Sequence, residues 1–430
     1  MRDERPMLDV RLLRETPEVI RKDLRKRGWL DKLPLVDEAA ADDAEWRQAK
    51  KRVDDLRHTQ NKLTAEIAAL KRAGNDTKDK LAEVKGISDE ISTLEKRAQE
   101  LQARVKEILM SLPNILHESV PVGPDESGNV TLRTWGKPRE FDFTPKDHLD
   151  LLGALGLIDM ERAAKISGSR FFFLKGDALR LELSIMRYAV DFLSDRGFTA
   201  VGPPLMMRKE AYAGVVDLGD FGPVIYKIDG DDLYLIATSE HPLVAMHMDE
   251  IMAGDSLPVK YCGFSPNFRA EAGAHGKDTK GIFRTHQFYK VEQVVFSKPE
   301  QSWQIHDELI ANSEAIFQSL GLHYRIVNIC TGDIGTVAAK KYDLEAWMPT
   351  QQRFREMVSC SNVTDYQARR LMIRYKEKQS AEPTLVHTLN STAVTTRALV
   401  AVVENFQQRD GSIAIPKPLV PYMGGRDRIS

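Results

Sequence analysis

Two long stretches with apolar residues spaced three or four positions apart constrain the fold of this chain more than any other feature. In residues 46–70 and 84–112 this spacing is typical of a helix with one apolar stripe, interrupted in the first stretch by Gln60. The turn-forming residues 73–77 separate the stretches, and Pro113 ends the second. Two such helices can bury their stripes against each other, so the sequence predicts an antiparallel helical hairpin.

Basic side chains outnumber acidic ones in the first of these helices, residues 46–72. The cations that we single out are Lys50, Arg52, Arg57, Lys62, Lys71 and Arg72. Lysine and arginine clustered on an exposed rod can neutralise backbone phosphates without reading bases. A solvated helix face has the same composition, and charge alone does not decide between the two interpretations.

The rest of the chain predicts an α+β domain. Residues 116–156 are rich in Pro, Gly, Asp and Ser, which is typical of a connecting region. Beyond residue 179, helical patterns alternate with strand-like runs at residues 232–238, 289–296 and 324–329. Strands and helices that alternate without regular crossover repeats predict a mainly antiparallel sheet flanked by helices.

A length of 430 residues is sufficient for two domains, which we expect in residues 1–115 and 116–430. The formal net charge of −2 exerts no overall attraction on a polyanion, so nucleic-acid binding would require a local basic surface. No stretch approaches the roughly 18 uninterrupted apolar residues of a membrane span. The N-terminus has no apolar signal core, so we expect a cytoplasmic protein. Cys262, Cys330 and Cys360 are far apart, which favours small packed side chains over a disulfide framework or a zinc site.

The densest group of chemically versatile residues lies in residues 268–274 and 281–292, which predict a strand, a loop and a second strand. Arg269 and Glu271 can point into one cleft because residues two apart share a face of a strand. An arginine fork fits phosphate oxygens, an aromatic ring stacks on a purine, and a carboxylate binds an ammonium or a hydroxyl group. This set suits ATP together with an amino acid, although a surface hairpin whose charges pair internally has the same composition. No glycine-rich phosphate-binding loop follows a predicted strand, so a nucleotide would have to be bound by another kind of structural element.

Two later segments add to this set. Glu356 and Ser359 supply oxygen atoms of the kind that Mg²⁺ prefers. The polar residues 387–392 precede an apolar helical pattern in residues 397–405, with Arg397 at its beginning. Each segment alone is weak support for a site, and their value lies in their occurrence together.

In this order, the segments closely resemble those of the seryl-tRNA synthetase family, which belongs to the class II aminoacyl-tRNA synthetases, and the resemblance covers essentially the whole chain. Besides the hairpin, the similar segments are residues 7–28, 114–123, 161–176, 197–204, 268–292 and 390–405. The last three resemble the three class II motifs, of which the first forms a dimer interface. The resemblance therefore implies a class II catalytic domain and a homodimer.

The resemblance also implies that the enzyme activates L-serine with ATP and Mg²⁺ and transfers it to tRNA(Ser), leaving open whether tRNA(Sec) is charged as well. The implied ATP-binding residues are Arg269, Glu271, Arg284, Thr285, Phe288, Glu356, Ser359 and Arg397. The implied serine-binding residues are Thr238, Glu240, Arg269, Glu292, Asn390 and Thr392. Of these, Arg269 and Arg397 would be catalytic, and Glu356 with Ser359 would bind Mg²⁺. The basic hairpin would recognise the long variable arm of the tRNA by shape and backbone contacts.

Transfer at phosphorus depends mainly on positioning and positive charge, so we assign no general base. His275, His286 and His387 lie in the relevant segments, where we expect them to be structural or to orient their neighbours.

One segment departs from the family. Ser391 follows Asn390 where the family usually has glycine, and the spacer to Arg397 is one residue shorter. Two rival interpretations accompany the main one. A related enzyme could activate an amino acid and load it onto a carrier protein, but the basic hairpin argues against this. A non-catalytic relative could bind RNA or a partner through the hairpin; the shortened spacer favours it, but the retained charged residues of the predicted site argue against it.

Overall fold

The structure is a computed structural model that describes residues 8–271 and 281–430. The chain forms two compact units, Met1–Ile115 and Leu116–Ser430, with separate hydrophobic cores. None of the helices in the described ranges combines the length and the apolar character needed to cross a membrane. The three cysteines are buried and free, as expected for small packed side chains.

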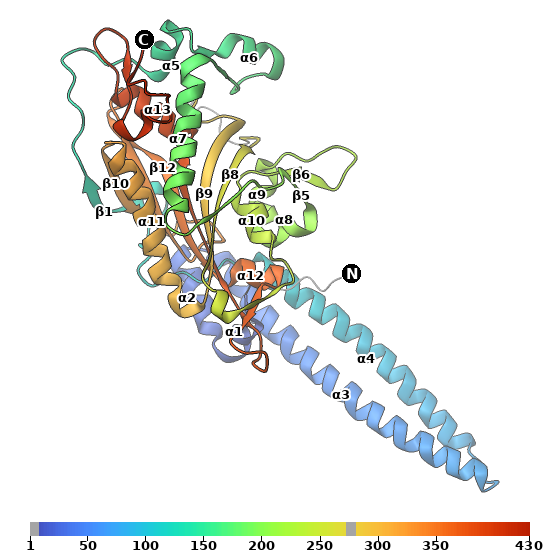
Figure 1. Cartoon of the computed structure of the whole chain (residues 1–430). Coiled ribbons are helices and arrows are strands. Elements are labelled where there is room, and N and C mark those ends of the chain that lie inside the picture. Colours follow the sequence, from blue (N-terminus) through green and yellow to red (C-terminus); the bar gives the residue numbers. More distant parts are fainter. Residues whose placement is uncertain (1–7, 272–280) are drawn as a thin grey trace. The chain divides into compact units, whose positions relative to one another are not determined.

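The first unit is built on the predicted helical hairpin (Figure 1). Helices α3 (Leu33–Arg72) and α4 (Lys78–Ser111) run antiparallel, and residues 73–77 connect them. Val53 and Leu56 of α3 pack against Ile91 of α4. The apolar stripes are therefore buried against each other, as their spacing predicts.

α3 is longer than the stretch predicted to begin at Trp46, because its apolar stripe continues toward the N-terminus. Val36 and Ala39 pack with Leu109 at the base of the hairpin. Two short helices complete this base, α1 (Val10–Glu15) and α2 (Pro17–Arg27). The base is thus a small core of its own beneath the two long helices.

The interruption of the apolar stripe at Gln60 has a partner across the hairpin. The Gln60 side-chain amide donates a 2.7 Å hydrogen bond to the Ser88 hydroxyl on α4. A polar pair at one level of a helical seam favours a single register of the two helices, at some cost in stability.

The second unit contains a twisted eight-stranded sheet in the order β1-β10-β11-β12-β15-β9-β8-β4 (Figure 1). The bounds are β1 (Val130–Trp135), β10 (Tyr324–Asn328), β11 (Lys340–Met348), β12 (Arg353–Thr364), β15 (His387–Thr395), β9 (Gln287–Ser297), β8 (Val259–Phe268) and β4 (Thr199–Val201). All neighbours pair antiparallel except β4 and β8. The predicted mainly antiparallel sheet is confirmed.

Helices α7 (Gly176–Ser194), α11 (Ser302–Ser319) and α13 (Thr396–Asn405) cover one face of this sheet. They enclose the main core with inward residues of the strands, including Val291 and Val295 of β9. Successive strand residues point to opposite faces, so Phe288, Lys290 and Glu292 of β9 point to the other face. That second face carries the candidate site.

A second core lies on the same side as the site. Val294 and Phe296 of β9 pack there against α8 (Lys209–Val215), α10 (Glu240–Ala245) and α12 (Tyr366–Leu371). The remaining helices are α5 (His148–Ala154), α6 (Met160–Ser167) and α9 (Leu218–Phe221). The remaining strands are β2 (Ile158–Asp159), β3 (Phe173–Leu174), β5 (Met206–Arg208), β6 (Leu233–Leu235), β7 (Ile251–Ala253), β13 (Arg374–Lys376), β14 (Thr384–Leu385), β16 (Ile413–Ala414) and β17 (Arg428–Ile429).

Candidate active site

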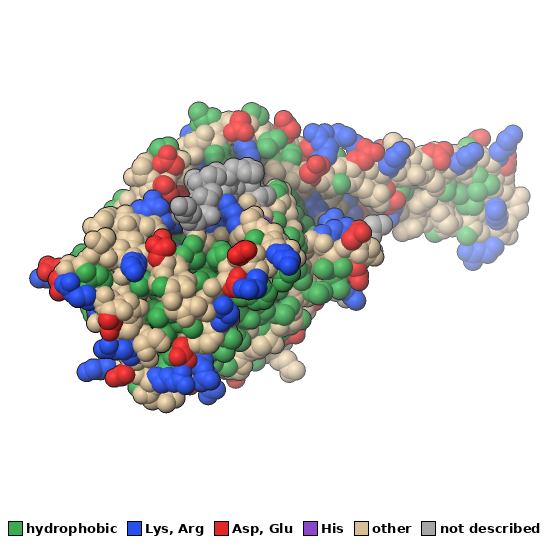
Figure 2. Space-filling view, turned by 90° about the horizontal axis from the view of Figure 1, so that it is seen from above, with side chains coloured by type: hydrophobic (Ala, Val, Ile, Leu, Met, Phe, Trp, Pro, Cys, Tyr) green, Lys and Arg blue, Asp and Glu red, His purple; other side chains and the backbone are tan. Residues whose placement is uncertain are grey.

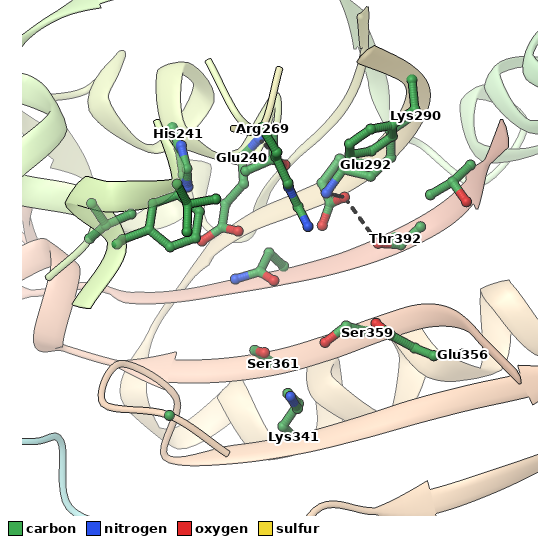
Figure 3. Close-up of a pocket in the computed structure, with 18 of the residues that line it drawn as sticks. Glu240, His241, Arg269, Lys290, Glu292, Lys341, Glu356, Ser359, Ser361 and Thr392 are labelled. Carbon is green, nitrogen blue, oxygen red and sulfur yellow. Dashed lines mark hydrogen bonds and ion pairs between the residues drawn. The ribbon is translucent and has the colours of Figure 1, made fainter. Parts of the chain in front are cut away.

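A cavity of about 600 Å³ lies over the face of the sheet opposite α7, α11 and α13 (Figure 3). Every side chain that the sequence predicts for ATP or serine binding lines this cavity: Thr238, Glu240, Arg269, Glu271, Arg284, Thr285, Phe288, Glu292, Glu356, Ser359, Asn390, Thr392 and Arg397. These residues are up to 159 positions apart in sequence, from Thr238 to Arg397, and the sheet brings them together. Residues 272–274 of the predicted loop, and His275, lie outside the described residues.

β9 supplies the centre of the site through strand alternation. Phe288, Lys290 and Glu292 share its pocket face. Lys290 and Glu292 form an ion pair whose side chains are only 7% and 2% exposed. Lys290 was not among the predicted site residues, although its position two residues from both Phe288 and Glu292 carries that signal. Burial raises the pKa of Glu292, while the ammonium group of Lys290 opposes this rise.

β15 contributes Thr392, whose hydroxyl donates to the Glu292 carboxylate over 3.3 Å (Figure 3). The two residues are also direct cross-strand partners. Beyond Thr392 the strand contains a β-bulge, because Val394 pairs with Val291 and leaves Ala393 as an extra residue. Thr392 and Thr395 consequently both line the cavity although they are three residues apart.

A second bulge acts in the same way on β12. Glu345 of β11 pairs with Glu356 while Leu344 pairs with Val358, so Met357 is the extra residue. In a regular strand Glu356 and Ser359 would point to opposite faces, because they are an odd number of residues apart. With the bulge, both side chains line the cavity. The bulge thus brings both predicted residues to one cavity, which their spacing alone does not reveal.

Glu240 lies at the beginning of α10 and faces the same part of the cavity as Glu292. Burial and the negative charge of Glu292 raise its pKa to about 7. Arg269 extends between these two carboxylates (Figure 3). Burial and the positive charge of Arg397 lower the pKa of Arg269. Two carboxylates thus share the site with two cations, Arg269 and Lys290.

The Arg269 guanidinium lies 5.1 Å from the centroid of the Phe288 ring and donates to the carbonyl oxygen of Ala237 over 3.3 Å. Its main chain is held by His286, whose Nδ1 lies 2.9 Å from the carbonyl oxygen of Arg269. His286 does not line the cavity, which agrees with the expected orienting role. His387 likewise lies outside it, with Nδ1 2.9 Å from the hydroxyl of Ser302.

The cavity wall next to Arg269 carries an ion pair between Glu271 and Arg284, whose charged atoms lie 3.0 Å apart. The buried Thr285 follows, and its hydroxyl donates to the carbonyl oxygen of Gln287 over 2.9 Å. The hydroxyl of Thr285 is therefore engaged locally.

At the opposite wall, Arg397 donates from Nη1 to Glu356, over 2.8 Å to the carbonyl oxygen and 3.0 Å to the carboxylate. Its Nε donates to the carbonyl oxygen of Phe283 over 3.2 Å. Thr395 caps α13 by accepting from the Arg397 N–H. Arg397 therefore begins that helix, as the sequence predicts. Partial removal from water at the cavity wall would raise the pKa of Glu356, but the charges of Arg397 and Lys341 outweigh this effect and lower it.

Other cavity residues carried no recognisable sequence signal. Residues 334–338 form one border of the cavity, and Lys341 and Ser361 also line it. Residues 334–338 carry no charged side chain and belong to the loop between β10 and β11, and their place next to the cavity depends on the sheet order rather than on a motif.

The cations predicted to contact tRNA lie on α3 and are exposed. Arg52 and Arg57 pair with Glu90 and Glu95 of α4, at 2.9 and 2.5 Å. Within the described residues, Lys50, Lys62 and Lys71 lie in no salt bridge, whereas Arg72 donates to the carbonyl oxygen of Ala68. α3 carries eight basic and eight acidic side chains and α4 seven of each, and Figure 2 shows both signs interleaved along the hairpin. The predicted basic excess is thus local to the outer part of α3.

Comparison with known proteins agrees with this arrangement. Residues 225–406 match the family model of the tRNA synthetase class II core domain (G, H, P, S and T), and residues 7–116 match the seryl-tRNA synthetase N-terminal domain. A serine–tRNA ligase of Methanocella arvoryzae is 53% identical over 421 residues, which are 97% of this chain and 99% of the relative.

Solved structures give the same result. The crystal structure of seryl-tRNA synthetase from Pyrococcus horikoshii complexed with ATP matches with a TM-score of 0.95 at 49% identity, covering 98% of this chain and 99% of that one. The cytoplasmic serine–tRNA ligase of Naegleria fowleri in complex with AMP matches with a TM-score of 0.89 at 39% identity, covering 98% of each chain. The predicted fold class is confirmed. The chain belongs to the seryl-tRNA synthetase family of class II aminoacyl-tRNA synthetases.

Proposed function

We propose that this chain joins L-serine to tRNA(Ser) in two steps. A serine carboxylate oxygen bonds to the α-phosphorus of ATP as the bond to pyrophosphate breaks, which gives seryl-adenylate. A terminal ribose hydroxyl of the tRNA then attacks the carbonyl carbon, and AMP leaves. The observation that carries this proposal is that one cavity unites several arginines with the buried set of Lys290, Glu292 and Thr392.

The buried set suits a small hydroxy amino acid. We assign serine binding to Thr238, Glu240, Arg269, Glu292, Asn390 and Thr392. Glu292 can accept hydrogen bonds from the serine ammonium and hydroxyl groups. Alanine would leave buried polar groups of this set unpaired, and such a site rejects an analogue without the hydroxyl far more strongly than an apolar pocket rejects a missing methylene. Threonine would be excluded by shape.

The rest of the cavity suits ATP. We assign the α-phosphate to Arg269, stacking on adenine to Phe288, and the distal phosphates and the far side of the base to Arg284 and Arg397. Glu271 and the main chain of Thr285 complete this part. Arg269 and Arg397 act as catalytic residues, because fixed positive charge stabilises the charge that develops on the phosphoryl oxygens.

Glu356 and Ser359 fit a magnesium ion that is bound together with ATP. They place oxygen atoms at the cavity, and the Glu356 side chain is 48% exposed. Among the described residues there is no group of three or more His, Cys, Asp or Glu side chains suited to a metal. Two protein ligands are enough for Mg²⁺, because it usually keeps several waters and shares substrate phosphates. When bound, the ion would neutralise phosphate charge.

We assign tRNA binding to the hairpin of the first unit. The exposed cations on its outer part, Lys50, Arg52, Arg57, Lys62, Lys71 and Arg72, can contact phosphates without reading bases. We further propose a homodimer and a cytoplasmic location. Charging of tRNA(Sec) is an additional activity to be tested with the purified acceptor.

Serine-dependent exchange of pyrophosphate into ATP tests the first step, with alanine, threonine and glycine as controls. We expect exchange with serine, followed by charging of tRNA(Ser) from a total tRNA preparation. Exchange without charging would favour loading of a carrier protein. An absence of exchange with every amino acid would instead favour a non-catalytic RNA-binding protein and contradict the proposal.

A further inference from the structure

A buried glutamine outside the cavity contacts one of the proposed serine ligands. Gln367 lies on α12 and is 1% exposed. Its Nε2 donates a 3.0 Å hydrogen bond to Oε1 of Glu240. Gln367 does not line the cavity, so it reaches the site only through Glu240.

The orientation of this side-chain amide is determined by its surroundings. Nε2 also donates to the main-chain carbonyl of Val215 over 3.2 Å. A carbonyl oxygen can only accept, so the nitrogen must occupy this position. Oε1 accepts a 2.7 Å hydrogen bond from the buried hydroxyl of Thr388 on β15. Both amide hydrogens are therefore donated, and the carbonyl oxygen has its own partner.

Glu240 depends on such a donor because it is half-buried close to a second carboxylate. Burial and the charge of Glu292 disfavour the ionised form of Glu240, and the Gln367 hydrogen bond favours it by holding the pKa down. The same bond restricts the direction of the carboxylate, since it ties Oε1 to α12.

We infer that Gln367 is a positioning residue for serine: its amide, held by Val215 and Thr388, orients the Glu240 carboxylate toward the amino-acid side of the cavity. This inference rests on the proposed role of Glu240 in serine binding. Gln367 does not touch the substrate, so its removal should affect serine far more than ATP.

The test compares Gln367→Met with Gln407→Met. Gln407 is a matched control because it is also buried, at 2% exposure, and its amide is also fully used, by Lys146 and the carbonyl of Glu404. Neither of these two partners lines the cavity. Both variants should lose similar thermal stability.

In pyrophosphate exchange we expect Gln367→Met to raise the KM for serine by about 10- to 100-fold, the usual effect of losing a hydrogen bond to a charged group. Its KM for ATP should change less than about twofold, and Gln407→Met should change neither.

Glu240→Gln distinguishes the possible failures. If it raises the KM for serine while Gln367→Met does not, the inference about Gln367 is wrong and the proposed site stands. If neither substitution changes the KM for serine, the assignment of Glu240 fails and the inference fails with it. An equal rise in the KM values for serine and ATP would mean that Gln367 has only a structural role.

Thr388→Val provides a second route if Gln367→Met does not fold. Valine has nearly the shape of threonine and removes only the hydrogen bond to the Gln367 carbonyl. We expect a smaller rise in the KM for serine, of a few fold, with an unchanged KM for ATP. An unchanged KM for serine in this variant would contradict the positioning role.

Discussion

At the residue scale, the balance of charge around Glu292 is the feature most closely tied to substrate choice. Glu240 and Glu292 face Arg269 and Lys290 in a cavity where the Lys290–Glu292 pair is almost completely buried. Removing one member of a buried pair leaves the other charge without compensation, which costs far more than the net contribution of the pair. Substitutions here should therefore have large effects.

We expect Glu292→Ala to abolish serine-dependent pyrophosphate exchange, because the ammonium and hydroxyl groups of serine lose their acceptor and Lys290 is left unpaired. Lys260 and Glu308 form a more exposed lysine–glutamate pair, 2.5 Å apart and outside the cavity, so Glu308→Ala is the control for removal of such a glutamate and should retain exchange. Normal exchange by Glu292→Ala would refute the assignment of the serine subsite.

A different buried carboxylate should affect stability. Glu182 on α7 accepts a 2.5 Å hydrogen bond from Thr396, and Thr396 accepts one from the main-chain N–H of Tyr289. Burial raises the pKa of Glu182 from its ordinary value of 4.5 to about 7. Between these values the folded state holds a proton that the unfolded state has released. The free energy of unfolding therefore falls as the pH rises through this window, by roughly 3 kcal/mol in total.

Glu182→Gln keeps the hydrogen-bond acceptor and removes the ionisation. We expect the variant to be more stable than the parent chain at pH 8 and to differ little from it near pH 4.5. Urea unfolding at several pH values measures the difference. Parallel pH dependence of the two proteins would show that Glu182 does not titrate in the folded state near neutrality.

At the scale of elements, the hairpin shows how neighbouring helices modify a charge pattern. The outer part of α3 is basic, but Glu90 and Glu95 of α4 pair with Arg52 and Arg57. Arginines in such pairs are already partly neutralised. We therefore expect the lysines of α3 to contribute more to phosphate binding than these two arginines.

We predict that Lys62→Ala weakens tRNA(Ser) binding and reduces the dependence of log Kd on log salt concentration by about one, the effect of losing one phosphate contact. Arg57→Ala should reduce this slope less. Titration of labelled tRNA at several salt concentrations measures both values, with exchange activity as the check on folding. A slope that Lys62→Ala leaves unchanged would exclude a phosphate contact by Lys62.

Much of this architecture could be predicted from the sequence, because it depends on local patterns. The stripe that ends near Leu112 predicts the hairpin, and alternation predicts the pocket face of β9 around Phe288 and Glu292. The acidic partners of Arg52 and Arg57 could not be assigned, because pairing across a hairpin depends on the register of two helices. Gln367 had no signal at all, since only the folded second unit brings α12 to Glu240, 127 positions away.

At the scale of the whole molecule, the two units have separate cores and separate proposed tasks. The hairpin above its base contributes to neither the cavity nor the base cluster. Residues 46–96 can therefore be removed and the cut ends joined by a short Gly–Ser turn. This deletion retains the Glu45–Arg97 and Asp42–Arg104 pairs across the remaining helices.

We expect the shortened protein to form seryl-adenylate at nearly the rate of the full chain and to lose charging of tRNA(Ser). Pyrophosphate exchange and charging assays on the same preparation separate the two steps. Undiminished charging would contradict the assignment of tRNA recognition to the hairpin, and loss of exchange would contradict the independence of the two units.

The two β-bulges, at Met357 of β12 and Ala393 of β15, have a consequence for how this family can change over time. Deleting one residue from a regular strand turns every following side chain to the wrong face. A strand with a bulge already contains an extra, unpaired residue. One residue can be lost or gained at that position while the side chains before and after it keep facing the same sides of the sheet. The segment between Asn390 and Arg397 contains such a position, so a change of one residue in its length would leave Thr392 and Arg397 facing the same cavity.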